Sequence, residues 1–317
     1  MLKKSEKLKL GVVFLSMLVL SALPAAEETE GNAEEGAAPK EKRSSVYSVF
    51  VNVAAEDFYF PLFGLVNIAR GDQRVPQFGL ININGGTLRS GQMGLFNTAG
   101  RNLLGLQLGL ANAAGGELRG AQMGLANFAF KGVRGVQLGL ANISTKSIRG
   151  MQFGLFNYAD SAEGGVPVGL LSVVRHGGYR ALELSFAEAL PVNLAFKIGT
   201  EKFYSSFIFS FYPDFKDLEI AFGFGAGSII PVTRYFFINP EINNVTPLTL
   251  EQNFLSFTPL AGFNLGSHIS IVAGPSLAYI YTIDDGDIRN PLFTIGKKFN
   301  DEHSLLLGVK AGVRIRF

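Results

Sequence analysis

A 15-residue repeat is the feature that most restricts how this chain folds. From residue 62 the chain carries eight copies with no insertion between them, and six of the eight begin with Gln. The cores lie at residues 62–67, 77–82, 92–97, 107–112, 122–127, 137–142 and 152–157, with a decayed copy at 167–172. Copies of a short repeat bury a core together, so the repeat determines the architecture.

Two architectures fit this repeat. In a β-solenoid each copy is one coil, and stacked coils give parallel ladders of Gln and Asn around a Leu core. In an up-and-down barrel each copy is one membrane-crossing strand and a turn. Residues 135–143 form one alternating run of nine residues without an internal turn signal, and a tilted transmembrane strand has about nine to eleven. We therefore expect the barrel and keep the solenoid as the alternative.

The second half of the chain, residues 181–317, also alternates between apolar and polar positions. In its last strand Val309, Val313 and Ile315 lie on one face, whereas Lys310 and Arg314 lie on the other. Charged side chains opposite a lipid-facing surface point into a wet lumen. This pattern indicates that the last strand closes a transmembrane barrel.

Counting strands gives the expected size of that barrel. One strand near residues 46–53, up to eight from the repeats and about nine from the second half predict an all-β, antiparallel transmembrane barrel of about 16 to 18 strands over residues 46–317. The alternative is a solenoid of 15-residue repeats joined to a smaller C-terminal barrel. The longest expected loops are residues 239–253 and 284–291.

The first residues predict export. Residues 1–26 combine a lysine-rich head, an uncharged run and small residues before Glu27, which is the pattern of a signal peptide, with an uncleaved anchor as the alternative. Residues 27–45 are charged and predict a flexible linker. Residues 1–26 hold four lysines and one glutamate, so their removal takes the net charge from +2 to about −1, which gives no support to nucleic-acid binding.

Two further motifs resemble those of a known family. The strand at residues 308–317, with its terminal Phe317, resembles the assembly signal of bacterial outer-membrane barrels. The Gly-x-Gln-x-Gly-Leu-x-Asn repeats are similar to those of surface-repeat proteins of spirochaetes and Bacteroidetes, and residues 169–204 resemble the segment that follows such repeats. The resemblance implies the bacterial outer membrane as the location, with outer-membrane lipid, the assembly machinery and periplasmic chaperones as partners. It brings no catalytic residue.

We expect a pore or passive channel without enzymatic activity. The candidate lumen-facing residues are Gln77, Gln92, Gln107, Gln122, Gln137, Gln152, Lys197, Lys310, Arg314 and Arg316. The other interpretation of the glutamines is that they satisfy their neighbours by cross-strand hydrogen bonds. The alternative function is a surface-exposed structural or adhesion protein that transports nothing.

Neither a cofactor nor a metal site is predicted. The chain has no Cys, and its three histidines, His176, His268 and His303, are far apart in sequence and lack the spacing of metal ligands. The acidic cluster at residues 284–287 lacks the spaced ligands of a calcium loop and is interpreted as a solvated turn.

Overall fold

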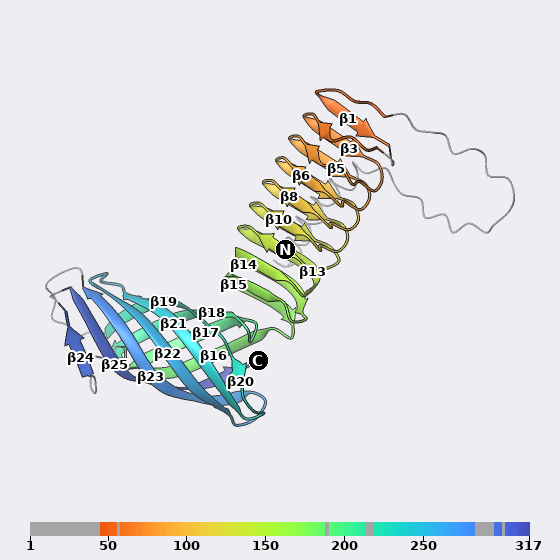
Figure 1. Cartoon of the computed structure of the whole chain (residues 1–317). Helices are drawn as coiled ribbons and strands as arrows, with labels where there is room; N and C mark the ends of the chain where they lie inside the picture. Colours follow the sequence, from red (N-terminus) through yellow and green to blue (C-terminus); the bar gives the residue numbers. More distant parts are fainter. Residues whose placement is uncertain (1–44, 56–57, 188–189, 214–217, 283–294, 300–301) are drawn as a thin grey trace, which may run out of the picture.

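The computed structural model describes residues 45–55, 58–187, 190–213, 218–282, 295–299 and 302–317. This part of the chain is all-β and contains no helix, and therefore no helix that could cross a bilayer. Its strands form two sheets, a parallel one from the repeats and an antiparallel one from the second half (Figure 1). The predicted signal peptide, residues 1–26, and all but the last residue of the predicted linker, residues 27–45, lie outside the described residues.

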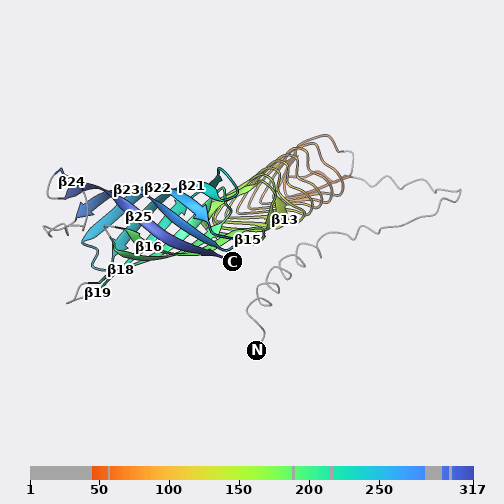
Figure 2. The same cartoon turned by 90° about the horizontal axis from the view of Figure 1, so that it is seen from below.

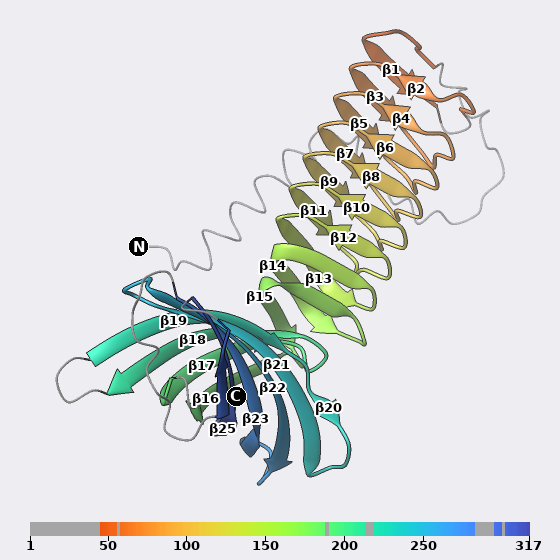
Figure 3. The ribbon, with the colours of Figure 1, turned by 60° about the vertical axis from the view of Figure 1, so that its left-hand side comes forward.

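The repeats form a β-solenoid in which parallel strands stack coil upon coil (Figure 3). One side consists of β2 (Leu62–Phe63), β4 (Gln77–Phe78), β6 (Gly91–Met93), β8 (Leu106–Leu108), β10 (Ala121–Met123) and β12 (Val136–Leu138). A second side consists of β1 (Val51–Ala54), β3 (Val66–Ala69), β5 (Ile81–Asn84), β7 (Phe96–Ala99), β9 (Ala111–Ala114), β11 (Ala126–Ala129) and β13 (Ala141–Ile148). In the last two coils, β14 (Met151–Ala162) and β15 (Val166–His176) run through both sides.

Strand residues of one coil pair with residues 15 positions along the chain, except that Ser147 and Ile148 pair 14 positions on, with Ser161 and Ala162. Gln107 pairs with Gln122 on the first side and Asn97 with Asn112 on the second. A third side closes the coil through single parallel bridges such as Leu103 to Leu118. The interior is therefore made of columns of identical or similar side chains, which explains why the repeat tolerates no insertion.

The buried amides of the solenoid bond to one another along the stack. From Asn52 to Asn142, each Nδ2 donates to the Oδ1 of the asparagine in the next coil, at 2.7–2.9 Å. From Gln92 to Gln152, each Nε2 donates to the Oε1 of the glutamine in the preceding coil, at 2.6–2.8 Å. A buried amide without a partner is costly, so these ladders fix the register of every coil.

A glycine column forms the corner between the first and second sides. A Cβ on Gly94 would lie 2.1 Å from the carbonyl oxygen of Gly79, and one on Gly109 would lie 2.4 Å from that of Gly94. Backbones that approach this closely leave room only for glycine. In the first six copies the Gly-Leu pair is therefore a bend between two strands, and in the last two copies it lies within β14 and β15.

The second half forms a closed antiparallel barrel (Figure 2). Its eight strands, in order around the barrel, are β16 (Tyr179–Ala187), β17 (Val192–Gly199), β18 (Tyr204–Pro213), β19 (Leu218–Gly227), β21 (Phe236–Pro247), β22 (Gln252–Asn264), β23 (Ile269–Thr282) and β25 (His303–Arg316). Pairing of β16 with β25 closes the ring. The short β20 (Ile230–Pro231) pairs with β21, and β24 (Ile295–Lys298) pairs with β25.

Side chains alternate between the two faces of the barrel wall. Leu184, Phe224 and Ile242 are exposed on the outside, and their neighbours Glu183 and Glu241 are buried inside. An apolar outside and a polar inside is the opposite of the arrangement in a soluble barrel.

The structure confirms the all-β prediction and the antiparallel barrel but corrects its size. A single barrel of 16 to 18 strands is wrong, because the repeats form the solenoid that was the alternative, and the barrel of residues 179–316 has eight strands. The nine-residue run at 135–143 is not one strand, since it bends at Gly139 between β12 and β13. The predicted loop at residues 239–253 is also wrong, because most of it lies in β21.

The last coil of the solenoid rests on the outer rim of the barrel. Ser205, whose side chain points outward from β18, donates from Oγ to the carbonyl oxygen of Gly169 in β15. Arg180 of β16 donates from Nη2 to the carbonyl oxygen of Val174 at 2.8 Å. The stack leaves this end of the barrel to one side and does not continue along the barrel strands (Figures 1 and 3).

Candidate functional site inside the barrel

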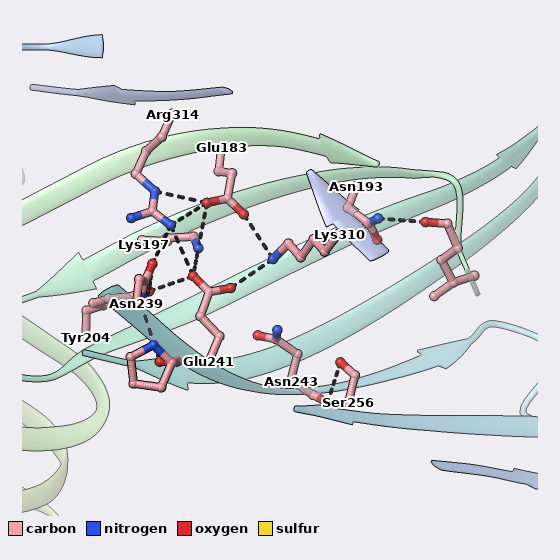
Figure 4. A network of polar contacts seen from close by, with 12 residues as sticks. Glu183, Asn193, Lys197, Tyr204, Asn239, Glu241, Asn243, Ser256, Lys310 and Arg314 are labelled. Atoms are coloured by element: carbon pink, nitrogen blue, oxygen red, sulfur yellow. Dashed lines mark hydrogen bonds and ion pairs between the residues drawn. The ribbon is translucent and has the colours of Figure 1, made fainter. Parts of the chain in front are cut away.

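Five charged side chains meet in the middle of the barrel, and we call them the barrel cluster: Glu183, Lys197, Glu241, Lys310 and Arg314. They come from four strands, β16, β17, β21 and β25, and alternation turns each of them inward. All five are buried. The cluster thus connects opposite walls of the barrel through its interior (Figure 4).

Every cation of the barrel cluster contacts both carboxylates. Lys310 Nζ lies 3.0 Å from Glu183 Oε1 and 2.8 Å from Glu241 Oε2. Lys197 Nζ lies 2.8 Å from Glu183 Oε2 and also pairs with Glu241. Arg314 Nη2 lies 2.6 Å from Glu183 Oε2 and 3.2 Å from Glu241 Oε1. Buried charges require partners of this kind, because a lone charge in a dry interior is very costly.

Neutral groups complete the shell on the side of the cluster nearer the solenoid. The Tyr204 hydroxyl donates to Glu241 Oε1 at 2.6 Å and accepts from Asn239 Nδ2 at 2.7 Å. Asn239 Oδ1 accepts from Arg314 Nη2 at 2.7 Å. The Phe237 ring lies 5.9 Å from the Arg314 guanidinium carbon, so an aromatic face also contacts the cation.

A small cavity lies beside the cluster. It has a volume of about 60 Å³, and its lining includes Lys310 together with Ser185, Ser206, Asn243 and Thr258. The last four each have a buried side-chain oxygen without a hydrogen-bond partner among the residues that the structure describes. Apolar side chains such as Leu190, Ile208 and Phe254 also line the cavity, so water molecules in a space of this size would lie at its polar groups.

The barrel cluster offers no recognisable catalytic or metal-binding set. Its five groups are paired carboxylates and cations, and none of them is a histidine or a serine. Within the described ranges no group of three or more His, Cys, Asp or Glu side chains is arranged to hold a metal ion.

The three histidines lie at separate places. His176 Nδ1 is 3.3 Å from Asp160, His268 contacts the neighbouring Ser267, and His303 Nδ1 is 2.6 Å from the Tyr279 hydroxyl. The acidic cluster at residues 284–287 lies outside the described residues.

Comparison with known proteins adds no assignment to this geometry. No protein-family model, curated protein or solved structure matches the chain.

The structure divides the residues predicted to face a lumen into three groups. Lys197, Lys310 and Arg314 point into the barrel as members of the cluster. Arg316 lies near the barrel end, 3.1 Å from Glu201, next to Phe317, whose ring is 6.3 Å from that of Phe196. The third group is buried inside the solenoid and does not face the barrel interior: Gln77, Gln92, Gln107, Gln122, Gln137 and Gln152. The prediction was wrong for these glutamines because the corner glycines make each copy a coil and not a barrel strand.

Neither carboxylate of the barrel cluster is among the residues predicted to face a lumen, and neither are the neutral partners Tyr204 and Asn239. Glu183 was visible as a charged residue between Leu182 and Leu184 in an alternating strand, and this position is the signal of an inward charge. Glu241 lay in the segment predicted to be a loop. Its pattern, Asn239, Glu241 and Asn243 at every second position, is that of a strand whose inner face is polar.

Proposed function

We propose that this chain is an outer-membrane protein whose eight-stranded barrel is a closed anchor for the solenoid and conducts no solute. The observation that carries the proposal is the barrel itself, which is apolar outside and filled inside by the barrel cluster. A closed ring of strands leaves no unpaired backbone edge, as lipid requires. A barrel of about eight strands has an interior that side chains alone can fill.

The ends of the strands support an orientation. The barrel begins at Tyr179 and ends at Arg316 on the same rim, where the solenoid is attached. The longest connection between barrel strands, residues 283–302 between β23 and β25, belongs to the opposite rim. Outer-membrane barrels have short turns on the periplasmic side and longer loops outside. The solenoid is then periplasmic, and outer-membrane lipid surrounds the barrel wall.

The same proposal assigns export and assembly signals to the two ends of the sequence. Residues 1–26 would direct export with the help of periplasmic chaperones, and the strand ending at Phe317 would be read by the outer-membrane assembly machinery. Replacing Phe317 with Ala should reduce the amount of heat-modifiable protein in the outer-membrane fraction. The matched control is Phe299→Ala, another exposed phenylalanine outside the closing strand. Equal amounts for both variants would remove Phe317 from this role.

Bilayer recording separates the closed anchor from the pore expected from the sequence. Purified full-length protein is reconstituted into vesicles, and flotation verifies its incorporation. The same preparation is then fused with a planar bilayer. The closed anchor predicts no steady conductance, because the paired charges of Glu183 and Arg314 block the interior. Reproducible single-channel steps from floated protein would overturn the anchor in favour of a passive channel.

A further inference from the structure

Charge is strictly segregated within the solenoid repeat. Eight nine-residue segments contain no Asp, Glu, Lys or Arg: 61–69, 76–84, 91–99, 106–114, 121–129, 136–144, 151–159 and 166–174. Every charged residue between positions 61 and 174 falls in the six-residue links that separate them. In the coil, the uncharged segments are the first and second sides and the corner between them, and the links form the third side.

The uncharged corner is also apolar and exposed. A column of eight leucines follows the corner glycines, and each is between 42% and 58% exposed: Leu65, Leu80, Leu95, Leu110, Leu125, Leu140, Leu155 and Leu170. Beside it, Phe63, Phe78, Met93, Met123 and Leu138 are exposed on the first side. We call these two columns the apolar corner. With strands about 4.8 Å apart, the corner is more than about 30 Å long, and soluble monomers rarely expose an apolar surface of this extent.

The third side, opposite the corner, has the reverse character. Arg74, Arg89, Arg119, Arg134 and Arg149 form an exposed column there. Three of them pair with acidic residues of the same side, for example Arg119 Nε with Glu117 at 2.7 Å. The whole solenoid is therefore amphipathic across its width, with an apolar corner and a charged back.

The apolar corner ends against the outer wall of the barrel. In the last coil the corner is Gly169 and Leu170, and the Gly169 carbonyl oxygen accepts from Ser205, an outward residue of β18. The paired outward residue of β17, Ile198, is covered at this contact and only 7% exposed. Further along the same strands the outer wall is exposed and apolar, as at Phe209. The corner is thus continuous with the surface that the proposed function places in lipid.

The stack runs sideways from this contact. The stack leaves the barrel end to one side (Figure 1), so each preceding coil lies farther from the barrel and the stack does not continue along the barrel strands. The corner is also uneven from coil to coil. At the position after the leucine, Phe96 is followed by Ala111, Ala126 and Ala141. A fluid acyl-chain surface accommodates such unevenness, whereas a folded partner would need a matching shape.

We infer that the apolar corner binds the lipid surface next to the barrel. Its side chains insert into the leaflet on the side of the membrane where the solenoid is attached to the barrel rim. The charged side then faces water, as in other elements that lie in the membrane interface. This inference rests on the proposed function, because it takes the barrel to be in a membrane. The solenoid then lies along the membrane surface and does not project from it.

The absence of tryptophan from the chain allows a direct test. Single tryptophans are placed at Leu125 on the apolar corner, at Leu104 on the charged side and at Ile242 on the barrel wall. A fourth variant, Phe96→Trp, replaces an exposed aromatic directly after Leu95 of the apolar corner, in case Leu125→Trp does not fold. Each full-length variant is reconstituted into phosphatidylcholine vesicles with and without bromine on the acyl chains, after its heat-modifiable mobility has been verified. Bromine quenches only tryptophans that contact the acyl region.

We expect Leu125→Trp to be quenched to within roughly twofold of Ile242→Trp, with little quenching of Leu104→Trp. Quenching at Ile242 without quenching at Leu125 or Phe96 overturns the lipid contact of the corner and leaves the barrel in the membrane. No quenching at Ile242 overturns the proposed function itself. Unquenched, blue-shifted emission at Leu125 in protein that sediments as a dimer assigns the corner to a second copy, and this also overturns the lipid contact.

Discussion

Removing one amide from the middle of the asparagine ladder should open the solenoid locally. Asn112 accepts from Asn97 Nδ2 and donates to Asn127 Oδ1, each at 2.9 Å, and it also donates to the Met123 carbonyl oxygen at 2.9 Å. Asn112→Ala removes all three bonds from a site that is 1% exposed. The side chain's volume is small, so the lost hydrogen bonds dominate the effect.

The magnitude follows from the groups left without partners. Among the described residues, Asn127 Oδ1 has no other donor, and one N–H of Asn97 loses its acceptor. The Met123 carbonyl oxygen keeps the Gly109 N–H at 3.0 Å. Two unsatisfied buried groups cost about 1–3 kcal/mol each, or about 2–6 kcal/mol together. Coils contact only their neighbours, so the cost falls on local opening and not on the barrel.

Native-state hydrogen exchange measures this local opening in the full-length protein in detergent. Since about 1.4 kcal/mol is a factor of ten, amides of the coils around Asn112 should exchange at least about thirtyfold faster in Asn112→Ala. Barrel amides should be unchanged. The control is Arg101→Ala in the same coil, an exposed position expected to change stability by less than about 0.5 kcal/mol. Equal exchange in the two variants would show that the ladder contributes nothing to stability.

Three further predictions concern the corner, the barrel cluster and pH. Gly109→Ala should destabilise the solenoid by at least about 2 kcal/mol, measured by the same hydrogen exchange. The control Gly91→Ala should be neutral, because its Cβ would meet its nearest atom at 3.5 Å. Equal effects of the two substitutions would refute the close approach of the backbones at Gly109. Glu241→Gln leaves three buried cations with one carboxylate and should destabilise the barrel by about 3–5 kcal/mol. Its urea midpoint, from loss of heat-modifiable mobility, should fall well below that of the exposed Glu201→Gln control, and matching midpoints would contradict a structural role. Burial tends to raise the pKa of Glu117, but hydrogen bonds and charges from Arg119 and Arg134 lower it overall. The ionised carboxylate therefore stabilises the solenoid at neutral pH, and this stabilisation disappears as the pH falls through the lowered pKa. This loss should be at most about 0.5 kcal/mol and absent in Glu117→Gln, and an equal acid response of both proteins would refute it.

The 15-residue repeat predicts a periodic fold, but the prediction that one copy forms a single straight strand was wrong. Gly139 and Leu140 continue the alternation of Gln137 and Leu138, so the run looks like one strand. The bend becomes visible only when the coils are stacked, because the reason for glycine is the carbonyl oxygen of the preceding coil. Inside the solenoid, the Asn and Gln columns were predicted as ladders under the alternative architecture. Their hydrogen bonds depend on parallel pairing that local pattern does not distinguish from hairpins.

In the barrel, the closing strand was easier to predict than its partners. Lys310 and Arg314 stand out because they interrupt an otherwise apolar strand. Glu241 does not, since its neighbours Asn239, Pro240 and Asn243 are also frequent in turns. The pairing of these residues joins positions up to 131 apart in the chain. Such contacts depend on how many strands close the ring, and the sequence alone overestimated that number.

The strict 15-residue register also makes the reach of the solenoid a discrete quantity. Duplication or loss of one whole copy would move every earlier coil by one strand spacing, about 4.8 Å, and leave the barrel contacts of Gly169 and Val174 intact. A change of one or two residues would instead put a leucine where a glycine or an amide must fit. The length of the solenoid can therefore change in steps of one coil while its attachment to the barrel stays constant.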